Sequence, residues 1–317
     1  MKVRFLTVII YFCAVLITGL PAQKTDPNLP DNRAESQTAI AEPNEPNCVS
    51  LSAGDEFNKE FAPIFSEYVN KDSKVDYRKL SKYGLEMQAL LARLAILEPQ
   101  EYESWTTDEK IAFWINTYNL KMLDIIANNY PVESRRLDRL WWPPNSIRHI
   151  PPRGDVGTPK WNSCKFIVMD EEFTLYEIEN RFFKNQFKDP RIFLALTMAT
   201  LDSPPIRPEP YYGKELDKQL EEQTKRFLSS PRAFNIDRNA GKVYLSVLFE
   251  PKWPWYGKEF LDKYAIDKKF KDRSPEIRAV LNFISKYVDS ASVSYLETGN
   301  YKIEFISYDW RVNEQLN

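Results

Sequence analysis

The stretch that most constrains the fold is residues 106–130, TTDEKIAFWINTYNLKMLDIIANNY. Thr106 and Glu109 have the spacing of a capping box, in which both side chains bond free amides at the start of a helix. Pro131 cannot continue a helix, so the sequence predicts one helix that ends by Tyr130. At about 100° per residue its apolar residues share one arc, and they are Ala112, Ile115, Met122, Leu123 and Ile126.

Two asparagines interrupt this apolar arc. Asn119 falls in its middle and Asn116 at its edge. Asparagine is a poor residue inside a helix because its amide competes with the backbone. An amide on a buried face also costs free energy unless it finds hydrogen-bond partners. The pair therefore predicts a buried polar cluster, which either braces a neighbouring loop or binds a ligand.

The composition is that of a globular protein with a sizeable core. The 317 residues are 43% hydrophobic and 14% aromatic, enough for one large domain or two small ones. Lys and Arg total 43 against 45 Asp and Glu, so the net charge is −2. No basic block is longer than a few residues. Nucleic-acid binding is not expected, because phosphate contacts need a concentrated basic face.

The N-terminal region has the pattern of a secretory signal. In residues 1–22, Lys2 and Arg4 precede the apolar run Phe5–Leu20. The run has about 16 residues, whereas a spanning helix needs about 20. We expect an exported protein, whether periplasmic, envelope-associated or secreted. Membrane attachment is expected only if this segment is retained as an anchor. Residues 23–54 are rich in Pro, Asn, Asp and Glu, which predicts a disordered linker.

A single globular domain is predicted over residues 55–317. Apolar residues at helical spacing predict helices, and these cover residues 57–68, 77–97, 174–183, 212–228 and 275–288. Short strands are predicted at 165–169, in a hairpin over 235–249, and in a C-terminal hairpin that pairs 293–296 with 301–305. The apolar run 189–200 fits a buried strand or a helix. The expected class is α+β, with a helical N-terminal half around a central buried helix, packed on short, mostly antiparallel strands of the C-terminal half.

Thiol and imidazole groups are scarce. Cys48 and Cys164 follow the predicted signal, and they either pair in an oxidising compartment or remain free. His149 is the only histidine and lies in a proline-rich loop, so a packing or surface role is expected. The sequence offers no ligand set for a metal ion, and no cofactor is expected.

Six motifs, in this order, resemble the family called domain of unknown function 547, DUF547. They are AFWINTYN at 112–119, TLYEIEN at 174–180, DPRIFLAL at 189–196, SPPIRP at 203–208, WYGKEF at 255–260 and YDWRVN at 308–313. The resemblance extends over roughly residues 55–313. It implies an architecture and little mechanism, since the family is named for lacking an assigned function.

The chain departs from that family where chemistry is expected. Phe193 stands where the family has a histidine, and Asn180 stands where it has another. Met198 and Ser203 occupy the two cysteine positions. A thiolate or imidazole role that relatives give these positions is therefore absent here, so the chain is a pseudoenzyme candidate.

The first functional hypothesis is a non-catalytic module that binds a peptide, a glycan or a protein partner. Its candidate binding residues are Asn116, Asn119, Glu179 and Arg191. Arg191 could bind a carboxylate, or it could pair with Glu177 or Glu179. The aromatic residues that could offer a stacking face are Trp141, Trp142, Trp253, Trp255 and Tyr256.

The alternative is a hydrolase or transferase distantly similar to thiol enzymes of papain or transglutaminase type, with the thiol chemistry lost or replaced. Its remaining polar groups would be Ser203, Glu179, Asp202, Asp309 and Asn119, with Glu179 and Asp309 as an acid–base pair. A purely structural envelope component is the third hypothesis.

Overall fold

The computed structural model describes residues 50–134, 138–150, 164–251, 258–266 and 269–316. They belong to one compact unit, residues 49–317. The predicted signal, most of the predicted linker, Cys48 and the aromatic residues at 253–256 lie outside the described residues. Helices and two small sheets make up the unit, so the α+β class is confirmed. Within the described residues, no helix combines the length and the apolarity needed to cross a bilayer.

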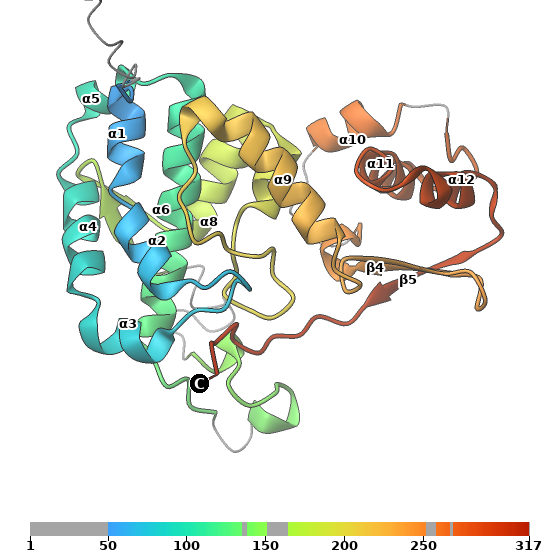
Figure 1. The fold of residues 1–317 in the computed structure, drawn as a ribbon, viewed down its shortest axis with the longest axis horizontal. Helices are drawn as coiled ribbons and strands as arrows, with labels where there is room; N and C mark the ends of the chain where they lie inside the picture. The colour runs from blue at the N-terminus through green and yellow to red at the C-terminus, as the bar shows by residue number, and fades with distance from the viewer. Residues whose placement is uncertain (1–49, 135–137, 151–163, 252–257, 267–268, 317) are drawn as a thin grey trace, which may run out of the picture. The chain divides into compact units, whose positions relative to one another are not determined.

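Five short helices lie alongside one long helix (Figure 1). The short ones are α1 (Ala53–Lys59), α2 (Ala62–Tyr68), α3 (Tyr77–Tyr83), α4 (Leu85–Ala95) and α5 (Pro99–Glu103), and the long one is α6 (Thr107–Ala127). Each of the first two predicted helices is therefore divided in two. The second divides at Gly84, which is a poor helix former. Leu85, one of the apolar residues of the helix predicted over 77–97, is 80% exposed.

The capping box of α6 is confirmed. The Glu109 amide donates to Thr106 Oγ1 at 3.3 Å, and the Thr106 amide donates to Glu109 Oε2 at 2.7 Å. The prediction of one buried arc is too narrow, because Phe113, Trp114 and Leu120 are also fully buried. Other elements cover α6 on several sides, so apolar residues outside the predicted arc are buried as well.

The chain after α6 consists of short elements. They are the 3₁₀ turns η1 (Asp138–Leu140) and η2 (Ile147–His149), strands β1 (Phe166–Val168) and β2 (Glu171–Phe173), helix α8 (Leu175–Ile178), the π-helix η3 (Glu179–Phe187) and the 3₁₀ turn η4 (Pro190–Leu194). The strand predicted at 165–169 is β1, and it pairs with β2 in antiparallel fashion. A second capping box, Thr174 with Glu177, opens α8 at the start of the helix predicted over 174–183. The run 189–200 is neither a strand nor an α-helix, because the Asp189 carboxylate caps a 3₁₀ turn at its start.

The C-terminal part contains the larger sheet. Its elements are η5 (Gly213–Glu215), α9 (Leu216–Leu228), β3 (Phe234–Asp237), β4 (Lys242–Ser246), η6 (Val247–Phe249), α10 (Lys258–Tyr264), α11 (Pro275–Ile284), α12 (Ser290–Thr298) and β5 (Lys302–Ile306). The predicted hairpin is confirmed as β3 and β4. The predicted C-terminal hairpin is wrong. Residues 293–296 lie in α12, whose first turn is capped by Asp289, and β5 pairs with β4 in parallel.

The described apolar side chains form two cores. The first surrounds α6, and the second fills the space between the larger sheet, α10 and α11. Helix α9 contributes Leu216 and Leu220 to the first core and Phe227 and Leu228 to the second. Phe193 and Met198 pack against both cores. We call the boundary where these two side chains lie the seam.

A C-terminal segment, residues 308–315, crosses three distant loops, and we call it the tail. The amide of Val75 donates to the Asn313 carbonyl at 3.0 Å, and the Leu201 amide donates to the Arg311 carbonyl at 2.9 Å. The Val312 amide donates to the Asn145 carbonyl at 2.8 Å. The tail therefore joins segments from both ends and the middle of the domain by backbone hydrogen bonds.

Glu109 links the start of α6 to α1. It is 4% exposed and accepts hydrogen bonds from the Ser52 hydroxyl and the Thr106 amide. A β-carbon at Gly213 would lie 2.4 Å from Glu109 Cγ, so this position needs a glycine. Burial by itself raises the pKa of Glu109, but the hydrogen bonds from Ser52 and Thr106 outweigh it and hold the pKa below the ordinary 4.5.

We expect Glu109→Gln to lower the free energy of unfolding at pH 7 by about 1 kcal/mol, the usual cost of a lost helix cap. The folded-state pKa lies below the unfolded value of 4.5, so the contribution of the carboxylate is complete above that pH. It disappears as the pH falls through the folded-state pKa. Urea unfolding between pH 7 and pH 3 should show the difference from wild type narrowing on acidification. Glu86→Gln, at an exposed site, is the control, and a difference that widens in acid would contradict the prediction.

Candidate functional site

Asn116 connects α6 to α1 and to the segment before η5. Its Nδ2 donates to Asn58 Oδ1 and to the Tyr211 carbonyl, both at 2.9 Å. Its Oδ1 accepts from the Tyr211 amide at 2.8 Å. The side chain is fully buried, so these bonds replace those that water would make.

Asn119 holds the loop that follows η4. Its Nδ2 donates to the Ala195 carbonyl at 2.9 Å, and its Oδ1 accepts from the Thr197 amide at 2.8 Å. Met198 is the next residue of this loop. The predicted buried polar cluster is therefore present, and the contacts of both asparagines are those of the bracing alternative. A ligand role for either one remains a prediction.

Glu179 lies at the start of η3 and accepts a hydrogen bond from the Tyr118 hydroxyl at 2.8 Å. Burial raises the pKa of Glu179, and the Tyr118 bond and the charge of Lys184 offset part of this effect. The Tyr118 ring lies 6.4 Å from that of Phe183, which lies 6.4 Å from that of Phe193. A continuous row of rings thus connects this carboxyl to the seam.

Arg191 fastens η4 to α9. Its guanidinium bonds the Asp189 carboxylate, with Nη2 at 2.7 Å from Oδ2, and also pairs with Asp217 at 2.9 Å. Glu221 lies 3.9 Å from Nη1. The hydrogen bond to Asp189 is the main cause of the raised pKa of Arg191, and Asp217 adds to it. The expected partners were Glu177 or Glu179, whereas the observed ones are the aspartate of its own motif and two acids of α9.

The four family-motif positions are not assembled into a reactive group. Phe193 and Met198 are half-buried in the seam. The Ser203 hydroxyl donates to the Pro204 carbonyl at 2.9 Å and lies 3.1 Å from Thr197 Oγ1. The Asn180 amide donates to the Tyr176 carbonyl at 2.7 Å, one turn earlier in the chain.

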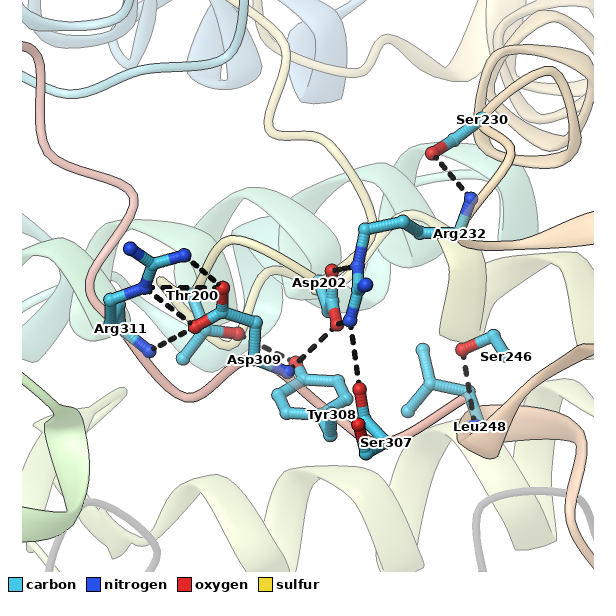
Figure 2. Close-up of polar contacts among 10 residues, drawn as sticks. All are labelled: Thr200, Asp202, Ser230, Arg232, Ser246, Leu248, Ser307, Tyr308, Asp309 and Arg311. Carbon is cyan, nitrogen blue, oxygen red and sulfur yellow. Dashed lines mark hydrogen bonds and ion pairs between the residues drawn. The ribbon is translucent and has the colours of Figure 1, made fainter. Parts of the chain in front are cut away.

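Asp202 and Asp309 are paired with arginines (Figure 2). Asp202 pairs with Arg232 and accepts from the Asp309 amide at 2.7 Å. Asp309 pairs with Arg311, whose bonds hold the pKa of Asp309 below its ordinary value. The hypothesised pair of Glu179 and Asp309 is therefore not supported by their contacts, since Asp309 faces Arg311 and Glu179 faces Tyr118.

A cluster that the sequence reasoning missed lies beside these ion pairs. The Arg148 Cζ atom is 3.8 Å from the ring centroid of Trp310 and 4.7 Å from that of Trp142. The ring of Tyr308 lies 4.5 Å from that of Trp310, and its hydroxyl lies 2.6 Å from Thr200 Oγ1. We call Trp142, Arg148, Tyr308 and Trp310 the arginine–tryptophan cluster. The recurrence of aromatic residues in WWPP and YDWRVN was its only sequence signal.

Other candidates lie apart from this cluster. Trp141 is 78% exposed. His149 is buried with Nε2 2.8 Å from the Pro143 oxygen, in keeping with the expected packing role, and it borders a pocket of about 410 Å³ with Asn129, Glu133 and Ser134. None of the four predicted binding residues lines that pocket. Within the described ranges, no group of three or more His, Cys, Asp or Glu could hold a metal ion.

A family model described as "Protein of unknown function, DUF547" matches residues 102–228. That stretch of the chain is similar to the DUF547 family. The match spans α6 to α9 and includes four of the six motifs, so the resemblance is confirmed there. The motifs at 255–260 and 308–313 lie outside the matched region, and residues 255–257 lie outside the described residues. Comparisons with curated proteins and with solved structures gave no match.

We expect Asn116→Ala and Asn119→Ala each to lower the free energy of unfolding by about 1–3 kcal/mol, because each leaves buried backbone groups without partners. Urea unfolding at pH 7 measures the loss. Asn180→Ala is the matched control, since the Asn180 amide bonds only the adjacent turns, at the Tyr176 carbonyl and Lys184 Nζ. Stability equal to wild type in both buried variants would rule out the bracing role.

Glu179→Gln should have the opposite pH dependence to Glu109→Gln. Burial raises the folded-state pKa of Glu179 above the ordinary 4.5, so wild type has its full stability from this group below that pH. It loses that stability as the pH rises through the raised pKa, while the neutral glutamine does not titrate. Unfolding between pH 4 and pH 8 should show Glu179→Gln gaining on wild type as the pH rises. A gain on acidification instead would contradict the raised pKa.

Proposed function

We propose that this chain is an exported binding domain that holds a peptide, a glycan or a protein partner without transforming it. The observation that carries the proposal is the position of Phe193 and Met198. They stand where the family resemblance implies histidine and cysteine, and here both pack against the two cores. Side chains of this kind stabilise the packing and offer neither a nucleophile nor a base.

The remaining polar groups near the seam support the same proposal. A serine nucleophile needs a base that accepts its proton, but the Ser203 hydroxyl donates to a backbone carbonyl. Asp202 is paired with Arg232, and Asp309 is paired with Arg311, whose hydrogen bond holds the pKa of Asp309 below its ordinary value. A carboxylate held in that way is a poor proton donor at neutral pH.

One observation favours the second candidate, a hydrolase. Glu179 is a carboxyl with a raised pKa that is hydrogen-bonded to a tyrosine, and such groups serve as acids or bases in many active sites. In this version Glu179 would supply the proton and Ser203 would have no role. The two candidates differ in whether a substrate is consumed.

We expect the double variant Phe193→His with Met198→Cys to lower the free energy of unfolding by about 2–4 kcal/mol, because it removes apolar contacts with both cores. Thermal or urea unfolding measures the loss. The matched control is Phe187→His with Met169→Cys, since these half-buried side chains pack against the first core only, and its loss should be smaller. Equal losses would contradict a special role of the seam.

The functional test uses the purified full chain on peptide and glycan arrays and, in parallel, on ester, thioester, amide and glycoside substrates. Binding without turnover is the expected result. Turnover that Glu179→Gln abolishes and Ser203→Ala preserves would overturn the binding proposal in favour of the second candidate. No binding and no turnover would leave the third hypothesis, a structural component.

A further inference from the structure

Arg148 stands out by what its guanidinium does not contact. Nε is buried without a hydrogen-bond partner, and the group lies over the rings of Trp142 and Trp310. Among the described residues, no carboxylate forms an ion pair with it and no hydrogen bond of its guanidinium is observed. The side chain is half-buried, so the charge has lost part of its hydration. Indole rings replace only part of that loss.

Two carboxylates act on Tyr308 of the cluster, and both are engaged by arginines other than Arg148. Figure 2 shows that Asp202 is engaged by Arg232 and Asp309 by Arg311. Arg232 also donates to the Ser307 carbonyl at 2.8 Å, which fixes it on Asp202. Among the described residues, these two carboxylates are thus each paired with another arginine, and the Arg148 guanidinium has no carboxylate partner.

The chemistry of this group selects its ligand. A guanidinium is planar and presents parallel N–H donors that match the two oxygens of a carboxylate. The indole rings fix its plane before a ligand arrives, which lowers the entropy cost of binding. A phosphate brings close to two negative charges, whereas a carboxylate brings one and matches the single positive charge of the guanidinium.

We propose that the arginine–tryptophan cluster binds the carboxylate group of a small acidic molecule through Arg148. The inference rests on the proposed binding function and names the chemical class of its ligand. An acidic sugar and a peptide-type acid share the recognised group. The experiment therefore tests the two sources separately.

The experiment titrates the full chain with D-glucuronate, N-acetylglycine and acetate at constant ionic strength. D-glucose and N-acetylglycine amide are the neutral counterparts, and inorganic phosphate is the competing anion. Tryptophan fluorescence reports binding, because the ligand would meet the guanidinium that lies on Trp142 and Trp310, and calorimetry gives the affinity. All three carboxylates should bind, the neutral compounds should not, and phosphate should bind more weakly. Whichever of D-glucuronate and N-acetylglycine binds more tightly identifies the source of the carboxylate, an acidic sugar or a peptide-type acid.

Two substitutions and one control assign the site. Arg148→Gln should weaken carboxylate binding by about tenfold or more, and Arg148→Lys should lie between it and wild type, because lysine keeps the charge but loses the planar fork. Arg273→Gln is the matched control. Arg273 also lies on an aromatic ring, with Cζ 4.6 Å from that of Tyr301, but it pairs with Asp272 at 3.3 Å, and binding should not change. Circular dichroism confirms that each variant is folded.

The outcomes separate this inference from the proposed function. Equal carboxylate binding by wild type and Arg148→Gln, tighter binding of phosphate, or no binding of any carboxylate to wild type would each overturn the inference. An array ligand that Arg148→Gln binds as well as wild type would still support the binding domain. If the chain turns over a substrate and Arg148→Gln still loses carboxylate affinity, the proposed function is overturned but the inference about Arg148 holds.

Discussion

Hydrogen bonds from the buried polar side chains of α6 determine where the surrounding loops lie. The backbone of a helix satisfies itself, so its buried side-chain amides must take partners from other segments. Asn119 bonds Ala195 and Thr197, and Asn116 bonds Tyr211. The loops on either side of the SPPIRP motif are thereby attached to one helix. Breaking either attachment would leave buried donors and acceptors on both partners, which costs more than a surface bond would.

This attachment also fixes the seam. Met198 follows Thr197, whose amide is held by Asn119, and Phe193 precedes Ala195, whose carbonyl is held by the same side chain. The two motif positions are thus placed where the first and second cores meet. With apolar side chains there, the two cores gain contact area that reactive side chains would not supply.

Local signals made much of the fold predictable from sequence. Both capping boxes, helix α9 and the hairpin of β3 and β4 depend on residues a few positions apart. The C-terminal hairpin failed because residues 293–296 look strand-like alone, while Asp289 caps a helix there. The parallel pairing of β4 with β5 has no local signal. At the candidate site, buried amides could be inferred from Asn116 and Asn119, but their partners could not. The stacking of Arg148 on Trp310 joins two distant loops, and no pattern within either one indicates it.

The tail gives the domain an order of assembly. Asn313 accepts from the Tyr77 hydroxyl at 2.8 Å and donates to the Ser73 carbonyl at 3.1 Å, while its neighbours bond loops near residues 145 and 200. Contacts between such distant positions are slow to form, because the intervening chain must first be brought together. During synthesis the loops at 73–77, 145 and 199–201 emerge long before the segment that joins them. The backbone hydrogen bonds that join these loops can therefore form only after residue 315 has been made, which makes them a late step of folding.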